Sequence, residues 1–320
     1  MTKRKRKGAS YRTKALLWLV LLFAVLSLGW WLQALWQAAL ASKGCSAPTP
    51  LYTIDRFQEK TKLKFVVIGD AGTGESLQKQ VAHAVSTVCA QKGCDFVLYL
   101  GDNFYPNGVE SLDDPLFETA FDQVYREVKL PFFVVLGNHD VRGDVEPQRL
   151  YSLVNKKWHL PAYNYSFQAG PVNFFGVNSN CIPFSWFWLK DELNNAPAAP
   201  WNMVFTHHNL YGSGHHKDAP FLQKLWWEWG LADQVDFFFS GHEHLLEHLT
   251  PQGVPGEYWI SGAGGYPINR GDIDQAREDS RFMSTSQGLL WVSVEEAEVG
   301  LEFFDLYGAP LYQYQKKRTK

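Results

Sequence analysis

The stretch that decides the fold is Lys64-Phe65-Val66-Val67-Ile68-Gly69-Asp70-Ala71-Gly72-Thr73-Gly74. Its first five residues form a short, mostly apolar run that is typical of a buried β-strand. The glycine-rich residues 69–74 turn the chain, and apolar residues at helical spacing over residues 76–91 then predict an amphipathic helix. The stretch therefore predicts the first strand, turn and helix of a βαβ unit.

Two further buried strands are predicted downstream, at residues 95–100 and 132–136, and Pro115 is expected to open a helix between them. Strands that alternate with helices in this order imply right-handed crossovers and a parallel sheet. The later chain has a different pattern. It predicts a hairpin over residues 163–167 and 172–177, buried strands at 203–206 and 236–240 with a helix between them, and an antiparallel pair at 289–294 and 300–306.

Five polar clusters follow these buried strands, each at the point where a strand ends. In an open α/β sheet, sites form outside the carboxyl ends of the strands, so we expect these side chains to converge in one crevice. They supply two carboxylates, a phenol, an amide and at least three imidazoles, a donor set that suits Fe, Mn or Zn. The clusters are Asp70, Asp102 with Tyr105, Asn138 with His139, His207 with His208, and His242 with His244.

Each cluster alone also fits a purely structural role, as a helix cap or a turn. Their coincidence at five strand ends is what indicates a shared metal site. A glycine directly precedes four of the clusters, and we expect it to permit the sharp turn that aims the next side chain into the crevice. These glycines are Gly69, Gly101, Gly137 and Gly241.

Two other patterns are not expected to contribute to the site. The glycine-rich run 69–74 fits neither the GxxxxGK[ST] nor the GxGxxG motif, which argues against a nucleotide-binding P-loop. We assign no role to His83, His159 and His248, which lie in stretches predicted to be helical or irregular.

The first 42 residues differ from the rest. Residues 1–14 carry seven Lys and Arg and no acidic residue, and residues 15–42 carry no charge. As a helix, this uncharged segment would extend about 42 Å, whereas a bilayer core is about 30 Å thick. We predict a basic cytoplasmic N-terminus over residues 1–14 and a membrane-spanning signal-anchor over residues 15–42. A cleaved signal peptide is the alternative, because Ala39-Leu40-Ala41 resembles a cleavage site.

Either interpretation places the remainder outside the cytoplasm, in a periplasmic, extracellular or lumenal space, and secreted if the segment is cleaved. We expect a linker over residues 43–62, one catalytic domain over residues 63–310 and a basic tail over residues 311–320. Without the seven N-terminal cations, 23 Lys and Arg face 33 Asp and Glu, a net charge of −10. This acidic balance argues against nucleic-acid binding.

The chain has four cysteines, Cys45, Cys89, Cys94 and Cys181, and no CxxC pair. A thiolate zinc site is therefore not expected. Cys89 and Cys94 flank a predicted helix end, so they either pair in an oxidising compartment or remain free thiols.

The polar clusters and their neighbours resemble the five sequence blocks of the calcineurin-like metallophosphoesterases. Tyr105 in the second block is specific to the purple acid phosphatases, and residues 100–160 resemble the small, tartrate-resistant type. The resemblance covers residues 62–308 and implies an α/β/β/α sandwich of two mixed sheets flanked by helices. The blocks are residues 69–72 (GDAG), 101–105 (GDNFY), 137–140 (GNHD), 204–207 (VFTH) and 241–244 (GHEH).

The resemblance also implies a role for each matched position. Asp70, Tyr105 and His244 would bind a ferric ion. Asn138, His207 and His242 would bind a divalent ion (iron, zinc or manganese), and Asp102 would bridge the two. His139 and His216 would contact the substrate phosphate or leaving group, with His215 as a competitor for the second place. This sequence departs from the family pattern at Ala71, where a larger residue is common, and at Glu243, where Asp is common.

The implied activity is that of an acid phosphatase that hydrolyses phosphomonoesters, either small molecules or phosphoproteins, by attack of a metal-bound hydroxide. A leaving group needs a proton, for which His139 is the first candidate and His216 the second. One alternative is a phosphodiesterase or nucleotide hydrolase of the same superfamily, which Tyr105 disfavours. The other is a non-catalytic, membrane-tethered metal-binding module, which the complete ligand set disfavours.

Overall fold

The computed structural model describes Trp18, Phe23 and residues 25–29, 44–45, 50–267 and 275–318. The chain divides into two compact units, residues 1–42 and 43–320, and only the second is described below. Most of the predicted signal-anchor, residues 15–42, lies outside the described residues. Within the described part of the chain, no helix has the length and apolar character needed to cross a membrane.

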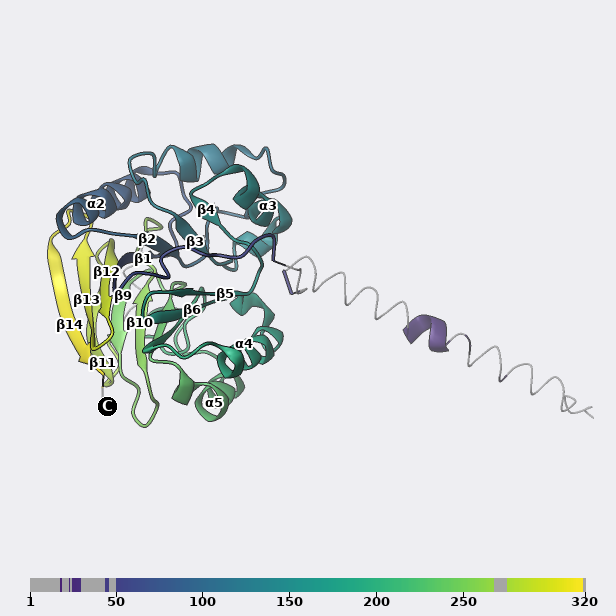
Figure 1. Ribbon diagram of the computed structural model, residues 1–320. Coiled ribbons are helices and arrows are strands. Elements are labelled where there is room, and N and C mark those ends of the chain that lie inside the picture. Colours follow the sequence, from purple (N-terminus) through teal and green to yellow (C-terminus); the bar gives the residue numbers. More distant parts are fainter. Residues whose placement is uncertain are drawn as a thin grey trace, which may run out of the picture. The chain divides into compact units, whose positions relative to one another are not determined.

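The second unit contains two mixed seven-stranded sheets (Figure 1). The first has the order β14 (Pro310–Lys317), β13 (Glu298–Asp305), β12 (Gly288–Glu295), β1 (Lys62–Ile68), β2 (Phe96–Tyr99), β3 (Phe132–Val134) and β4 (Trp158–His159). The second has the order β11 (Ser280–Ser284), β9 (Leu246–Leu249), β10 (Glu257–Ser261), β8 (Phe237–Ser240), β7 (Trp201–Thr206), β6 (Val172–Val177) and β5 (Tyr165–Ala169).

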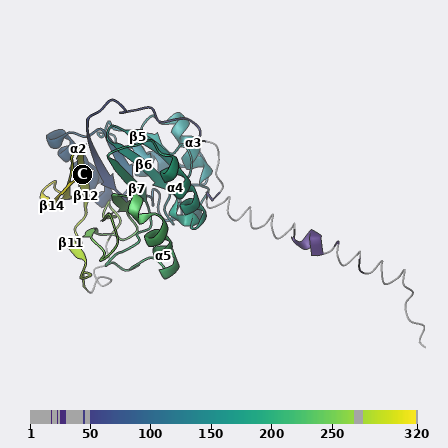
Figure 2. The same cartoon turned by 60° about the horizontal axis from the view of Figure 1, so that its bottom comes forward.

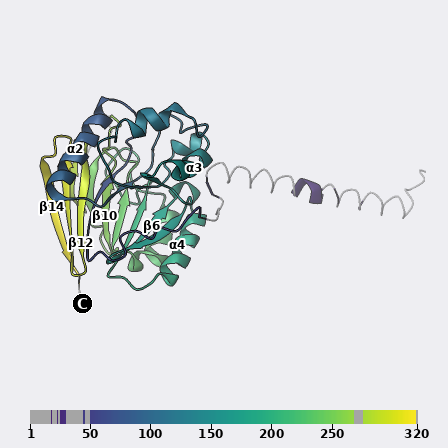
Figure 3. The ribbon, with the colours of Figure 1, turned by 45° about the horizontal axis from the view of Figure 1, so that its top comes forward.

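Helices cover the outer face of each sheet. Helix α2 (Ser76–Lys92) and helix α3 (Glu146–Val154) lie on the side of the first sheet, and α4 (Phe184–Asn195) and α5 (Phe221–Gly230) on the side of the second (Figures 1 and 3). The described residues of this unit also contain four short helical segments: the π-helix Phe117–Asp122 and the 3-10 segments Asp140–Arg142, Ser179–Cys181 and Ala232–Gln234. The layer order α/β/β/α agrees with the expected architecture.

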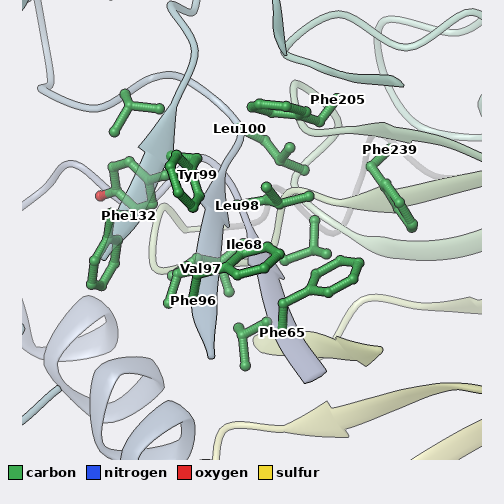
Figure 4. Packing of buried hydrophobic residues seen from close by; sticks show 14 of the residues in the cluster. Phe65, Ile68, Phe96, Val97, Leu98, Tyr99, Leu100, Phe132, Phe205 and Phe239 are labelled. Carbon is green, nitrogen blue, oxygen red and sulfur yellow. The ribbon is translucent and has the colours of Figure 1, made fainter. Parts of the chain in front are cut away.

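Aromatic side chains fill the space between the sheets (Figure 4). Phe65 on the central strand β1 stacks on Phe96 at 5.0 Å between ring centroids. It also makes edge-to-face contacts with Phe174 and Phe239, from the second sheet, at 5.5 and 6.2 Å. Because aromatic pairs of this geometry add to the free energy of burial, they fix the two sheets against each other.

Most predicted elements are confirmed. Strands β1, β2 and β3 are parallel neighbours, α2 spans almost the predicted residues, and β5 and β6 form the predicted hairpin around residues 170–171. Strands β7 and β8 and the antiparallel pair of β12 and β13 also form.

Four elements differ from the prediction. The segment after Pro115 winds as a π-helix over Phe117–Asp122 rather than as an α-helix. Residues 311–317 of the predicted tail belong to the edge strand β14 (Pro310–Lys317), which pairs with β13. His159 and His248 lie in strands, where His248 pairs with Glu257 at 2.9 Å and His159 hydrogen-bonds Tyr52 at 2.9 Å. Both histidines therefore stabilise the fold and lie outside the clusters of predicted ligands.

Both pairs of cysteines form disulfides. Cys89 and Cys94 pair at the end of α2, which decides between the two predicted states. Cys45 pairs with Cys181, across 136 residues of sequence, and this pairing was not predicted. It bonds the polypeptide just after residue 42 to the segment that leads into α4. Two disulfides are typical of a protein that folds in an oxidising compartment.

Candidate active site

The predicted site residues lie where strands of both sheets end. Asp70 and Asp102 follow β1 and β2 of the first sheet, and His207 follows β7 of the second. Backbone hydrogen bonds join the sheets at this edge: the Gly69 N–H donates to the Ser261 carbonyl at 2.8 Å. The His207 Nδ1 lies 2.9 Å from the Leu100 carbonyl oxygen, again from one sheet to the other. The sandwich thus brings together residues that are far apart in sequence.

One group of predicted ligands surrounds the phenol of Tyr105. Its hydroxyl donates to Asp102 Oδ2 at 3.0 Å and lies 3.3 Å from Asp70 Oδ1. His244 Nε2 lies 3.5 Å from the same phenol oxygen and 3.5 Å from Asp70 Oδ1. Four side chains from three separate loops therefore present oxygen or nitrogen atoms to one small volume.

A second group surrounds the ring of His207. Its Nε2 lies 2.9 Å from Asn138 Oδ1, 3.2 Å from His242 Nδ1 and 3.5 Å from Asp102 Oδ1. Asp102 is common to both groups, since its two carboxylate oxygens face different partners. All seven predicted ligands are thus brought together, in two groups that share Asp102.

The backbone at three of these residues is left-handed. Among the described non-glycine residues five have positive φ, and three of the five are Asp70 (56°), Asp102 (50°) and His242 (68°). Such a conformation costs about 1–3 kcal/mol, and it accumulates where function requires a particular side-chain direction. The strain supports a shared site at these residues.

The glycines before the clusters act differently from the prediction. Of these four glycines, Gly101 alone has a positive φ, of 85°. The left-handed backbone conformation therefore occurs mainly at the polar residues themselves. At Gly137 a Cβ would stand 2.2 Å from the Asp102 nitrogen, and at Gly241 a Cβ would stand 2.4 Å from Asp70 Oδ2. These two glycines are needed because the loops of the site approach each other closely.

The donor set fits a cation. Asp70 and Asp102 are 0% and 2% exposed, and in the part of the chain that the structure describes neither carboxylate pairs with a lysine or arginine. Buried carboxylates are costly unless a positive charge or several hydrogen bonds compensate them.

The hydrogen bonds of His207 are a second indication of a bound cation. Because a carbonyl only accepts, Nδ1 carries the proton, and the Nε2 lone pair then faces another acceptor, Asn138 Oδ1, at 2.9 Å. A metal ion resolves that conflict.

Burial dominates the protonation equilibria of the site. Together with the carboxylates of Asp70 and Asp102, it raises the pKa of Tyr105 well above its usual range. Burial and the neighbouring His207 lower the pKa of His242. Burial alone would also lower the pKa of His244. The hydrogen bond with Asp70 outweighs burial there, so the pKa of His244 is raised. Without a metal, the phenol therefore keeps its proton and the His242 ring stays neutral and ready to coordinate.

The histidines predicted to contact substrate lie beside the ligands. The His139 ring lies 4.5 Å from the Tyr105 ring, and its Nε2 is 3.9 Å from Asp102 Oδ2. The His216 ring stacks on His242 at 3.9 Å. The His215 ring, its competitor, lies 5.1 Å from the His216 ring. His208 is turned inward, with Nδ1 2.8 Å from Ser179 Oγ, and burial with His207 lowers its pKa to about 3.

Comparison with known proteins agrees with this geometry. Residues 63–246, more than half of the chain, match the family described as calcineurin-like phosphoesterase. The chain is 32% identical to purple acid phosphatase 3 of Arabidopsis thaliana, over 79% of this chain and 77% of that protein. The chain belongs to the purple acid phosphatases of this family. It is also 26% identical to human tartrate-resistant acid phosphatase type 5, over 80% of this chain and 91% of that protein.

Two solved structures share the fold of this purple acid phosphatase. The structure described as "GAP50 the anchor in the inner membrane complex of Plasmodium" has a TM-score of 0.70 at 21% identity, over 82% of this chain and 90% of that one. Purple acid phosphatase PPD1 from yellow lupin seeds has a TM-score of 0.64 at 16% identity, over 85% of this chain and 55% of that one. At these identities the likeness concerns the fold alone.

Sequence reasoning missed two neighbours of the ligands. Asp140 is fully buried and accepts backbone N–H groups from Gly137 at 2.7 Å and from Asn103 at 3.0 Å. It thereby joins the loop of Asn138 to the loop of Asp102. Burial and the Asp102 carboxylate raise the pKa of Asp140 to about 7. Its position beside His139 in the third block was a signal that could have been used.

Tyr266 is the second missed neighbour. Its ring lies 4.2 Å from the Tyr105 ring and 4.7 Å from the His244 ring, and its N–H donates to the Asp70 carbonyl at 3.0 Å. It follows β10, a strand that the sequence analysis did not predict. No polar cluster marked this segment, so nothing in the sequence pattern pointed to it.

Asp140→Asn keeps the side chain's size but weakens it as the acceptor that joins the two ligand loops. We expect kcat/KM of the metal-loaded enzyme to fall about 10–100-fold, as is usual when a group that orients metal ligands is lost. Metal content and steady-state phosphatase assays measure this. Asp236→Asn is the matched control, because Asp236 also accepts a backbone N–H, from Asn202 at 2.8 Å, but at the opposite end of β8. Equal losses in both variants would contradict the role given to Asp140.

Proposed function

We propose that this chain is an acid phosphatase that hydrolyses phosphomonoesters at a two-metal centre. The observation that carries the proposal is the pair of ligand groups that share Asp102, at 3.0 Å from Tyr105 and 3.5 Å from His207. Its kinship with the purple acid phosphatases supports the same activity. Two bound ions would supply Lewis acidity at the phosphate and lower the pKa of the attacking water.

The residues divide between the two ions as follows in this proposal. Asp70, Tyr105 and His244 would hold a ferric ion, because a trivalent ion would compensate two anionic oxygens and favour loss of the phenol proton that burial otherwise retains. Asn138, His207 and His242 are neutral donors and bind the divalent ion, which is iron, zinc or manganese. Asp102 belongs to both. The ring of His207 is fixed by the Leu100 carbonyl, which leaves Nε2 for coordination.

His139 is proposed as the proton donor to the leaving group. Its Nδ1 lies 2.6 Å from the Pro106 carbonyl oxygen, which can only accept, so Nδ1 carries a proton and fixes the ring. The second nitrogen, Nε2, faces the ligand groups and is free to exchange a proton. His216, stacked on His242, is the second candidate for contact with the leaving group or the phosphate.

We also propose that residues 15–42 anchor this domain to a membrane, with the catalytic domain of residues 63–310 on the side away from the cytoplasm. The support is the uncharged length of the segment, the basic residues before it and the two disulfides after it. If the segment is instead cleaved, the same domain is secreted.

The activity is tested with a monoester and a diester. At pH 5 we expect p-nitrophenyl phosphate to be hydrolysed with a kcat/KM at least about tenfold above that of bis(p-nitrophenyl) phosphate, because the site binds a terminal phosphate. Asn138→Ala is expected to lower the monoester activity about a hundredfold or more, since it removes a metal ligand. Faster hydrolysis of the diester would favour the phosphodiesterase alternative instead. No metal-dependent hydrolysis of either ester would favour a non-catalytic module.

The role of His139 is tested by the leaving group. We expect His139→Ala to lower kcat about a hundredfold or more for an alkyl phosphate, whose alkoxide needs a proton. For p-nitrophenyl phosphate, whose phenolate leaves without one, the loss should be much smaller. His216→Ala, measured beside it, separates the two candidates. An equal loss for both substrates in His139→Ala would assign the proton to another group.

The identity of the ferric ligand is tested by visible absorption. We expect the iron-loaded protein to show a broad charge-transfer band, because a phenolate bound to Fe(III) absorbs visible light, and Tyr105→Phe to abolish it. Tyr266→Phe is the matched control. The Tyr266 ring lies 4.2 Å from the Tyr105 ring, but Tyr266 is not one of the predicted metal ligands. An unchanged band in Tyr105→Phe, at equal iron content, would remove Tyr105 from the ligand set.

A further inference from the structure

The outer side of helices α4 and α5 is strongly apolar. The two helices lie side by side (Figures 1 and 2), and the rings of Phe187 and Trp226 meet at 5.0 Å. Trp229 is 82% exposed, and Phe221 and Phe187 are 71% and 59% exposed. We define the aromatic face by six exposed residues: Phe184, Phe187, Phe221, Leu222, Trp226 and Trp229.

These side chains are not needed for the core. The inner sides of the same helices carry Trp186 and Trp227, which are 6% and 1% exposed and pack against the second sheet. A surface helix normally places polar residues on the side away from the core. Here that side is aromatic, and between the helices it is hollowed into a groove of about 300 Å³ next to Lys190. An apolar patch of this kind marks a surface that binds something.

Three acidic side chains of these helices accept hydrogen bonds, and one of them, Asp191 next to Lys190, is exposed and accepts from Asn195. Glu192 accepts a hydrogen bond from Ser166, and Glu228 accepts one from Tyr211. Lys190, by contrast, borders the groove. This surface thus combines tryptophan, phenylalanine and leucine with a lysine. Segments that lie in the interfacial layer of a bilayer have the same composition.

A disulfide links the start of the second unit to the segment that leads into α4. The uncharged segment ends at Ser42, and Cys45, three residues later, is bonded to Cys181, which precedes Phe184 by three residues. Three residues extend at most about 10 Å. Two such stretches and the disulfide, whose Cα atoms are 5.2 Å apart, therefore give a covalent path of at most about 25 Å from Ser42 to the start of α4.

We propose that the aromatic face of α4 and α5 docks on the lipid surface next to the anchor, so that the catalytic domain rests on the membrane. The proposal relies on the membrane anchor of residues 15–42 but not on the phosphatase reaction. The bilayer is the occupant because Cys45, three residues after the uncharged segment, is bonded to the segment that leads into α4, and because the residues of this face have the chemistry of the bilayer interface.

The first test is hydroxyl-radical footprinting of the full chain in nanodiscs of phosphatidylcholine and phosphatidylglycerol. The reference is the same chain, released by a protease site inserted between Ser42 and Lys43 and separated from the nanodiscs before footprinting. We expect oxidation of Trp229 to slow at least about threefold in the nanodisc. Tyr307, which is 80% exposed and lies outside the aromatic face, serves as the internal control and should react equally in both states. Equal rates for Trp229 in both states overturn the proposal.

The second test uses the released domain and vesicles of the same lipids. Residues 43–320 contain both hydrophobic clusters and both disulfides, so this part keeps its fold without the anchor. We expect Trp226→Ser/Trp229→Ser to weaken vesicle binding about tenfold through lost apolar burial, and Tyr307→Ser to leave it unchanged. Hydrolysis of p-nitrophenyl phosphate should be unaffected in both variants.

The remaining outcomes separate this proposal from others. Protection of Trp229 that rises with protein concentration in the absence of lipid would show that a second copy covers the face, and would overturn membrane docking. Failure of the full chain to enter nanodiscs would remove the anchor and with it this proposal, and leave the phosphatase assignment intact. If the metal-loaded protein shows no phosphatase activity but Trp229 is still protected in the nanodisc, the proposed function is rejected and membrane docking is retained.

Discussion

The burial of two carboxylates at strand ends is the constraint on which the site depends. Asp70 and Asp102 are almost completely removed from solvent, and the described residues offer them no lysine or arginine partner. Each is instead surrounded by backbone donors and by phenol and imidazole rings: the His242 N–H donates to Asp70, and the His139 N–H donates to Asp102, both at 2.8 Å. Such a site is completed by cations, which explains why the chain accepts left-handed backbone at three polar residues.

The two sheets are what makes this arrangement possible. Each sheet supplies one part of the ligand set, and the aromatic core between them sets the separation of their strand ends. Asp140 then joins two loops of the first sheet, and the Leu100 carbonyl orients His207 from the second. The precision of the site therefore comes from hydrogen bonds between loops, and the sandwich positions those loops to within reach.

The sequence predicted those parts in which a local pattern determines the outcome. Buried strands and polar residues at their ends are such patterns, which is why β1, β2, β3 and the gathering of residues such as Asp70 and His207 were expected. Tyr266 and Cys45 were missed because their partners are distant in sequence, and no local spacing reveals such a contact. The role of Gly137 was also misjudged, because the close approach of Asp102 exists only in the folded chain.

Helices α4 and α5 show how one element can serve two surfaces independently. On the inside, Trp186 and Gln223 line a small cavity together with His208, so the helices support the loop that carries His207. On the outside, Trp226 and Trp229 make no comparable contact with the site. Apolar contacts are short-ranged, so occupation of the outer side leaves the inner packing unchanged. Attachment to a membrane would then fix where the phosphatase works, while the chemistry remains determined by the loops at the strand ends.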